Sequence, residues 1–133
     1  MKNWRGKVKL QKNMKILIDA NVILRYLLND VEEMAKKSAE IINAGAFTLP
    51  EVIAEVIYVL KSVYKIERGE ISAAILQIFN EIEVANKKIM IEAVKIFAES
   101  SLDFVDCILI AYNKVENVEI FSFDKKLNNR LNK

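Results

Sequence analysis

The sequence predicts an α/β protein, a three-layer α/β/α sandwich with a short parallel central sheet. Short apolar runs of strand length alternate with longer amphipathic helical patterns, and this order favours parallel strands that helices cover on both faces. Only three glycines and one proline occur in 133 residues, which argues against an all-β fold with many tight turns. A chain of this length fits one domain with a single core.

The first half of the chain contains two predicted strands and three predicted helices. In order they are a strand at 15–18, helices at about 20–29 and 31–43, a strand at 46–48, and a helix from Pro50 to about Tyr64. Gly45 is expected to end the second helix, because glycine is favoured where a helix stops. Pro50 is expected to begin the third, because proline is tolerated in the first helical turn.

The second half repeats the alternation. In order it contains a helix at 71–82, a strand at 88–91, a helix through Val94, Phe97 and Ala98, a helix at 103–116, a strand at 119–123 and a short helix at 125–131. The apolar stripe of the helix at 71–82 suits either the core or a subunit interface; its members are Ile71, Ile75, Ile78 and Phe79.

The residue types exclude several kinds of site. The chain has no histidine and one cysteine, Cys107, so an intramolecular disulfide, a Cys/His zinc site and a Ser-His or Cys-His catalytic group are excluded. Any metal must therefore be held by oxygen, and Cys107 is expected to be a core residue. No apolar run approaches the ~18–20 residues of a membrane helix, and the first residues lack a signal-peptide pattern, so we expect a cytoplasmic protein.

The charge is distributed unevenly along the chain. Residues 1–15 carry six basic side chains and no acidic one, whereas all 18 acidic residues lie after them. Met14 resembles a natural start, so we expect residues 1–13 to be a basic N-terminal extension and residues 14–133 to form the domain. The basic segment either contacts nucleic acid or has no role in the fold.

Four acidic residues interrupt or end apolar runs, namely Asp19, Glu55, Asp106 and Asp124. A carboxylate taken out of water is costly unless it is paired or binds a metal. Asp19 and Asp124 directly follow predicted strands, so both are expected at the carboxyl edge of the sheet, where ligands bind in such folds. A fold that gathers these acids forms either an ion-pair network or a site for Mg²⁺ or Mn²⁺.

Each acid also has a structural interpretation. Asp19 and Asp124 suit helix N-caps, and Glu55 lies at the border of an apolar helix face, where glutamates are usually solvated. Asp103 suits the first turn of the helix that contains Asp106.

Asp106 is the strongest candidate for a functional acid. The segment Phe104–Tyr112 is otherwise entirely apolar, so its helix is expected to be buried all round. No Lys or Arg lies within one helical turn of Asp106. The nearby polar residues Asn21 and Ser122 either orient the carboxylates or make local surface hydrogen bonds.

The order and spacing of these motifs resemble the PIN domain family, and within it the VapC-type ribonuclease toxins. The stretches that carry the resemblance are 18–24 (IDANVIL), 49–60 (LPEVIAEVIYVL), 102–111 (LDFVDCILIA) and 120–124 (IFSFD). The family's four acids match Asp19, Glu55, Asp106 and Asp124, and its asparagine matches Asn21. Ser122 stands where threonine is frequent. The position of Asp103 is often acidic in the family, and residues before Met14 have no family counterpart.

The resemblance implies a Mg²⁺- or Mn²⁺-dependent endoribonuclease that leaves a 5′-phosphate and a 3′-hydroxyl. Asp19, Asp106 and Asp124 would surround the metal, and Glu55 would bind the metal or its water. It also implies an antitoxin protein partner and a homodimer. Candidate phosphate contacts are Arg25, Lys61, Lys125 and Arg130, which are otherwise ordinary surface cations. The rival interpretations are a PIN nuclease of RNA processing without an antitoxin, and a non-catalytic binding domain.

Overall fold

The computed structural model describes residues 16–132, so the predicted extension at 1–13 lies outside the described range. The elements are β1 (Ile16–Leu17), α2 (Ala20–Leu28), α3 (Glu32–Gly45), β2 (Ala46–Thr48), α4 (Pro50–Ser62), α5 (Arg68–Ile78), β3 (Glu83–Val84), α6 (Lys87–Ala98), α7 (Phe104–Glu116) and α8 (Lys125–Leu131). Within the described range, no helix has the length and apolarity that crossing a membrane requires.

The three strands form one short parallel sheet in the order β1-β2-β3. Leu17 pairs with Phe47, and Phe47 in turn pairs with Glu83. The amide of Ile18 extends the ladder by donating to the carbonyl of Phe47 at 3.0 Å. Parallel neighbours joined by helical connections confirm the predicted α/β fold with a short parallel sheet.

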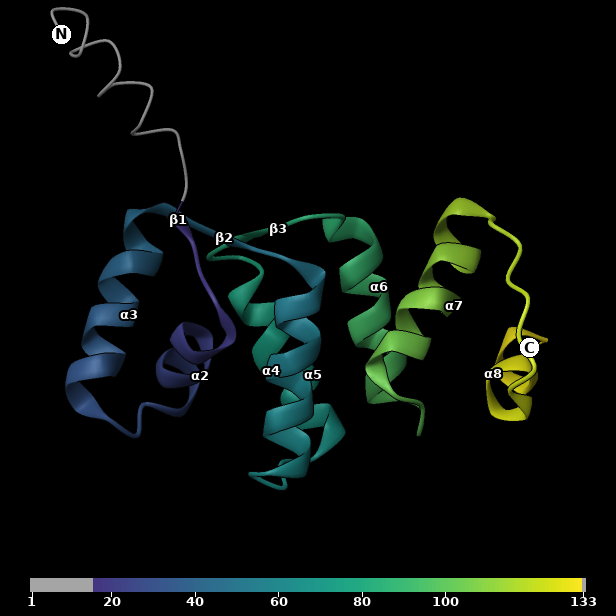
Figure 1. Ribbon diagram of the computed structural model, residues 1–133, viewed down its shortest axis with the longest axis horizontal. Coiled ribbons are helices and arrows are strands. Elements are labelled where there is room, and N and C mark those ends of the chain that lie inside the picture. Colours follow the sequence, from purple (N-terminus) through teal and green to yellow (C-terminus); the bar gives the residue numbers. More distant parts are fainter. Residues whose placement is uncertain (1–15, 133) are drawn as a thin grey trace, which may run out of the picture.

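The helices lie in a row below the strands, from α3 and α2 at one end to α7 and α8 at the other (Figure 1). The main packing pairs are α2 with α3, α5 with α6, and α6 with α7. Helix α4 stands in the middle and contacts both α2 and α7. It therefore links the helix that follows Asp19 to the helix that contains Asp106.

One continuous apolar core joins these helices. Ile53 and Val56 on α4 are fully buried, and the boundaries of α3 and α4 follow the predicted signals. Gly45 is the last residue of α3 and adopts a φ of 111°, which disfavours residues with a Cβ. Pro50 is the first residue of α4. Both predictions are confirmed.

The strand predicted at 88–91 is wrong. Residues 88–91 belong to α6, because Ile89 and Met90 continue a helical pattern of buried residues through Phe97. The third strand lies earlier, at Glu83–Val84, in a segment too short to be recognised from its own pattern. The apolar stripe of the predicted helix at 71–82 lies in the core, which confirms the first of its two predicted roles and leaves it no exposed surface for a subunit interface; its members are Ile71, Ile75, Ile78 and Phe79.

The predicted strand at 119–123 is not formed. These residues belong to no helix or strand, and Phe121 and Phe123 are 81% and 90% exposed. Their rings contact each other edge to face, with centroids 5.1 Å apart. The segment has the composition of a strand, but a strand exists only where a neighbour supplies its backbone hydrogen bonds. Here the segment connects α7 to α8 (Figure 1).

Candidate metal-binding and catalytic site

Asp106 lies in the first turn of α7, within the influence of other acidic side chains. Its side chain is half-buried, and burial raises the pKa of its carboxyl group above the usual 3.8. The negative charges of Asp124 and Asp103 raise this pKa further, while Lys126 opposes them. Asp103, Asp106 and Asp124 therefore form one neighbourhood of like charge, which favours a bound cation.

Helix α7 is not buried all round, which corrects the prediction for this segment. Phe104, Cys107 and Ile110 face the core, but Val105 is 58% exposed beside Asp106. The segment is apolar on more than one face, because the same helix carries both buried apolar residues and an exposed apolar residue in its first turn. Asp106 lies between these faces and is accessible to a ligand.

Asp19 is the N-cap of α2. Its Oδ1 accepts a hydrogen bond from the amide of Val22 at 3.1 Å, so the predicted capping role is confirmed. The cap uses one of the two carboxylate oxygens, which leaves Oδ2 for a ligand. The side chain is exposed.

The turn before Asp19 is anchored by Thr48. The Thr48 hydroxyl is fully buried and donates to the carbonyl of Ile18 at 2.9 Å. Sequence reasoning missed this residue, because a threonine at the end of a strand has no local signal for a long-range hydrogen bond. Thr48 fixes the backbone from which Asp19 projects.

Thr48→Val should destabilise the protein by about 1–3 kcal/mol, because the buried Ile18 carbonyl would lose its donor. Urea denaturation measures this free energy of unfolding. Thr48→Ser is the matched control, since it keeps the hydroxyl and removes only a methyl group. Equal stability of the valine variant and the wild type would show that the hydrogen bond contributes nothing.

Asp124 is the N-cap of α8. Its Oδ1 accepts from the amide of Leu127 at 2.9 Å, so the predicted cap is again confirmed. Ser122 makes the expected local bond, because its hydroxyl accepts from the amide of Asp124 at 2.9 Å. Asn128 donates to the Ser122 carbonyl at 2.9 Å. These bonds fix the turn that presents Asp124, and its Oδ2 is not used by the cap.

Glu55 is exposed on α4, as expected at the border of an apolar helix face, and Asn21 is exposed on α2. Asp103 is the N-cap residue of α7, in line with its expected place at the start of this helix, although its side chain makes no capping hydrogen bond. In residues 16–132, no group of three or more Asp, Glu or Cys side chains lies close enough together to hold a metal. The charges of Asp103 and Asp124 nevertheless act on Asp106, whereas Asp19 and Glu55 are not among the charges that act on it.

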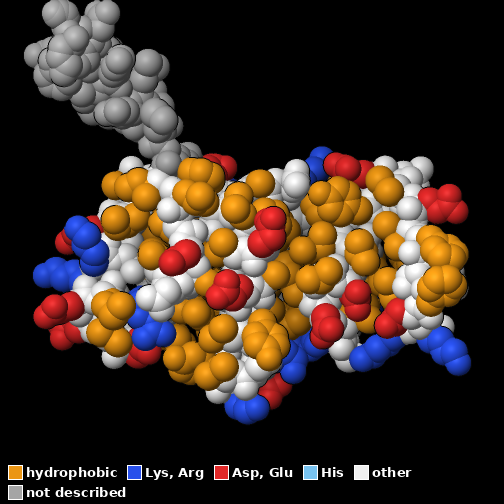
Figure 2. All heavy atoms as spheres, viewed as in Figure 1, with side chains coloured by type: hydrophobic (Ala, Val, Ile, Leu, Met, Phe, Trp, Pro, Cys, Tyr) orange, Lys and Arg blue, Asp and Glu red, His pale blue; other side chains and the backbone are white. Residues whose placement is uncertain are grey.

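These residues suit Mg²⁺ or Mn²⁺ by their donor chemistry. All the donors are carboxylate oxygens, and Mg²⁺ is usually bound by one or two carboxylates, several waters and substrate phosphates. A complete protein cage is therefore not required. Figure 2 shows acidic side chains spread across the middle of one face between apolar ones, with basic side chains along its lower edge.

The four predicted phosphate contacts divide into two groups. Arg25 forms an ion pair with Asp30 at 2.9 Å, and Arg130 forms one with Glu99. Lys61 and Lys125 are exposed, and neither has an ion-pair partner among the described residues. The two lysines are the better candidates for contacts to a phosphate.

Lys126 was also missed by sequence reasoning. It follows Asp124 by two residues and its positive charge acts on Asp106, although α7 and α8 are separated along the chain. The Lys126 ammonium donates to the carbonyl of Ser101 at 3.2 Å, which holds the beginning of α8 beside the segment that precedes α7. A lone surface lysine gives no sequence signal for this position.

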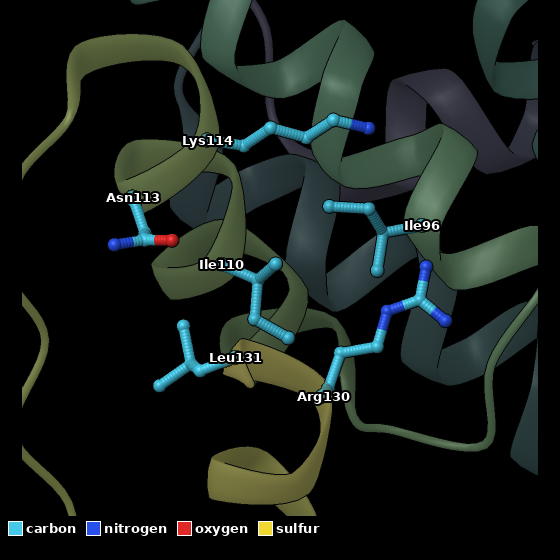
Figure 3. A pocket seen from close by; sticks show the side chains of 6 residues that line it. All are labelled: Ile96, Ile110, Asn113, Lys114, Arg130 and Leu131. Atoms are coloured by element: carbon cyan, nitrogen blue, oxygen red, sulfur yellow. The ribbon is translucent and has the colours of Figure 1, made fainter. Parts of the chain in front are cut away.

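A pocket of about 390 Å³ between α6, α7 and α8 lies apart from the acidic group (Figure 3). It is lined by Ile96, Ile110, Asn113, Lys114, Arg130 and Leu131. Lys114 and Arg130 are both in ion pairs, and no carboxylate lines the pocket. It therefore lacks the carboxylates expected of a site for Mg²⁺ or Mn²⁺.

Cys107 lies in the first turn of α7 and is fully buried, and this burial raises the pKa of its thiol to about 11. A thiol with this pKa is protonated at neutral pH and is a poor nucleophile. The prediction that Cys107 is a core residue is confirmed.

Comparisons with known proteins assign this chain to a family. A family profile described as "PIN domain" matches residues 16–130. The chain belongs to the PIN domain family. A curated "VapC ribonuclease" from Aquifex aeolicus (strain VF5) is 30% identical over 118 residues, which cover 83% of this chain and 87% of the relative. No solved structure matches the chain.

Proposed function

We propose that this protein is a metal-dependent endoribonuclease and the toxin of a type II toxin–antitoxin pair. The observation that carries the proposal is a half-buried Asp106 on which the charges of Asp103 and Asp124 act, in a member of the PIN domain family. The similarity to a protein named VapC ribonuclease over most of both chains supports the choice of RNA as substrate.

In the proposed site, Asp106 and Asp124 hold Mg²⁺ or Mn²⁺ together with Asp19, and Glu55 binds the metal or its water. The ion supplies an activated water near neutral pH and stabilises charge on the phosphoryl oxygens. The two N-caps fix the positions of Asp19 and Asp124 and leave one oxygen of each for this role. Asn21, Asp103 and Ser122 support the ligands.

Helix α4 is the element that could bring the remaining acids to the metal. Glu55 projects from α4, and α4 packs against both α2 and α7. Asp19 and Asp106 belong to the regions at the two sides of this helix. Because α4 touches both neighbouring helices, carboxylates from these elements would hold one divalent cation between them, and the cation would offset their mutual repulsion.

The remaining features of the proposal concern partners and organisation. We propose that residues 14–133 form the nuclease domain, that residues 1–13 are an extension, and that the protein is a cytoplasmic homodimer. An antitoxin protein is the proposed partner. Lys61 and Lys125 are the proposed phosphate contacts, with Arg25 and Arg130 less available because of their ion pairs.

The direct test uses purified full-length protein, single-stranded RNA and Mg²⁺ or Mn²⁺. We expect internal cleavage that leaves a 5′-phosphate and a 3′-hydroxyl, identified by end-labelling of the products. RNA binding without cleavage would instead support the non-catalytic alternative. Cleavage without growth arrest on expression, and without a co-purifying small protein from the source cells, would support an RNA-processing nuclease.

A further inference from the structure

A second pocket adjoins the acidic group and has a different chemistry. It has a volume of about 450 Å³, within the range of ~300–1,000 Å³ typical of small-ligand sites. It lies between α4 and the start of α7; its lining includes Ala54, Tyr58, Lys61, Arg68, Asp103 and Val105. Asp103 belongs both to this lining and to the neighbourhood of Asp106, so a ligand in the pocket would lie next to the proposed metal.

The mouth of this pocket exposes apolar surface from both helices. Tyr58 on α4 is 67% exposed and Val105 on α7 is 58% exposed. A single exposed apolar side chain is common on protein surfaces, but these two exposed side chains line the same cavity. An exposed tyrosine ring beside a cavity offers a flat face on which a planar group can stack.

Two cations line the same cavity. Lys61 follows Tyr58 by one helical turn and is exposed on α4. Arg68 begins α5; its guanidinium carbon lies 4.1 Å from the centre of the Phe97 ring, and its Nη1 donates to the Phe97 carbonyl at 3.1 Å. These contacts fix the orientation of Arg68 and leave other N–H groups for a ligand. Neither cation has an ion-pair partner in the part of the chain that the structure describes.

An aromatic face next to two cations is the arrangement that binds single-stranded nucleic acid, with a base stacked on the ring and phosphates near the cations. A purely apolar peptide segment would leave Lys61 and Arg68 without a counter-charge. Asp103 at the rim can accept a hydrogen bond from a base amino group. The chemistry of the cavity therefore favours a nucleotide of RNA over a peptide.

We propose that this pocket is the base-binding subsite for a nucleotide adjacent to the cleaved phosphodiester. Tyr58 stacks on the base, and Lys61 and Arg68 contact the flanking phosphate. This inference rests on the proposed ribonuclease function and adds the residues that select the cleavage position.

The test measures binding of a fluorescent single-stranded RNA to the full-length protein by anisotropy, in EDTA to prevent cleavage. Tyr58→Ala should weaken binding about tenfold, as expected for loss of one base stack. Tyr58→Phe should bind as the wild type does, because it keeps the ring. Lys61→Ala should weaken binding and lower the dependence of log Kd on log salt by about one charge. Lys88→Ala, an exposed lysine on α6, is the charge-matched control and should change neither.

An RNA that lacks one base gives a second readout. Removal of the stacked base should weaken binding to the wild type as much as Tyr58→Ala does, and should cause no further loss in that variant. With Mg²⁺ added, Tyr58→Ala should cut at altered positions.

The possible failures are distinguishable. RNA affinity and cleavage positions that are unchanged in Tyr58→Ala would overturn the subsite and assign the pocket to another occupant, such as a partner peptide. A wild type that binds RNA through Tyr58 but never cuts it would uphold the subsite and overturn the proposed nuclease.

Discussion

Asp106→Asn should abolish RNA cleavage and leave the protein folded. We expect a loss of at least ~100-fold in cleavage rate, because changes to residues that merely orient metal ligands already cost roughly 10–100-fold. The amide is nearly isosteric with the carboxylate, but it binds Mg²⁺ weakly. The rate of cleavage of an end-labelled RNA and the thermal unfolding midpoint are the two measurements.

The same variant should be at least as stable as the wild type at neutral pH. The raised pKa of Asp106 means that the folded state holds its proton more tightly than the unfolded state does. Stability therefore falls as the pH rises from the unfolded pKa of 3.8 through the higher folded value, and the ionised group is unfavourable above that window. The amide of the variant carries no charge, so the stability difference between the variant and the wild type should disappear below this window.

Glu116→Gln is the matched control, since Glu116 is an exposed acid at the other end of α7. It should change neither cleavage nor its metal dependence. A folded Asp106→Asn protein with full activity would assign Asp106 a structural role. Substantial unfolding of the variant would instead show that the carboxylate makes a stabilising contact in the folded protein.

Local signals in the sequence predicted much of the fold. The caps at Asp19 and Asp124, the first-turn proline of α4 and the glycine that ends α3 all act within a few residues, so a short window of sequence contains the necessary information. The helices were recognised because each has one apolar face, and the residues of that face recur in the sequence with the helical period.

The errors concern features that depend on distant partners. The strand Glu83–Val84 exists because the end of β2 lies beside it, and two residues carry no pattern of their own. Residues 119–123 have a strand-like composition but pair with no strand. The burial of α7 was overestimated for the same reason, because apolar composition does not tell which face has a neighbour.

The candidate site shows a similar division. The sequence identified which acids are present, and their order along the chain, but the neighbourhood of Asp106 with Asp103, Asp124 and Lys126 depends on how α8 packs beside α7. The pairing of Arg25 with Asp30 and of Arg130 with Glu99 was likewise not evident. Ion pairs between flexible side chains leave no periodic trace in a sequence.

Removal of divalent metal should stop cleavage completely. EDTA should reduce the rate to background, and excess Mg²⁺ or Mn²⁺ should restore it, because no histidine is present and Cys107 is buried with a raised pKa, so neither can activate a water or attack the phosphate. Gel analysis of the same RNA before chelation, after chelation and after metal addition gives the comparison.

Metal binding should also be visible without RNA. A cation bound between Asp106 and its acidic neighbours stabilises only the folded state, so the unfolding midpoint should rise with Mg²⁺ concentration in the manner of any ligand. Asp106→Asn should lose most of this rise, whereas Glu116→Gln should keep it, since Glu116 lies at the far end of α7. Cleavage that persists undiminished after thorough chelation would contradict the metal mechanism. An equal rise in the unfolding midpoint of all three proteins would place the bound metal away from Asp106.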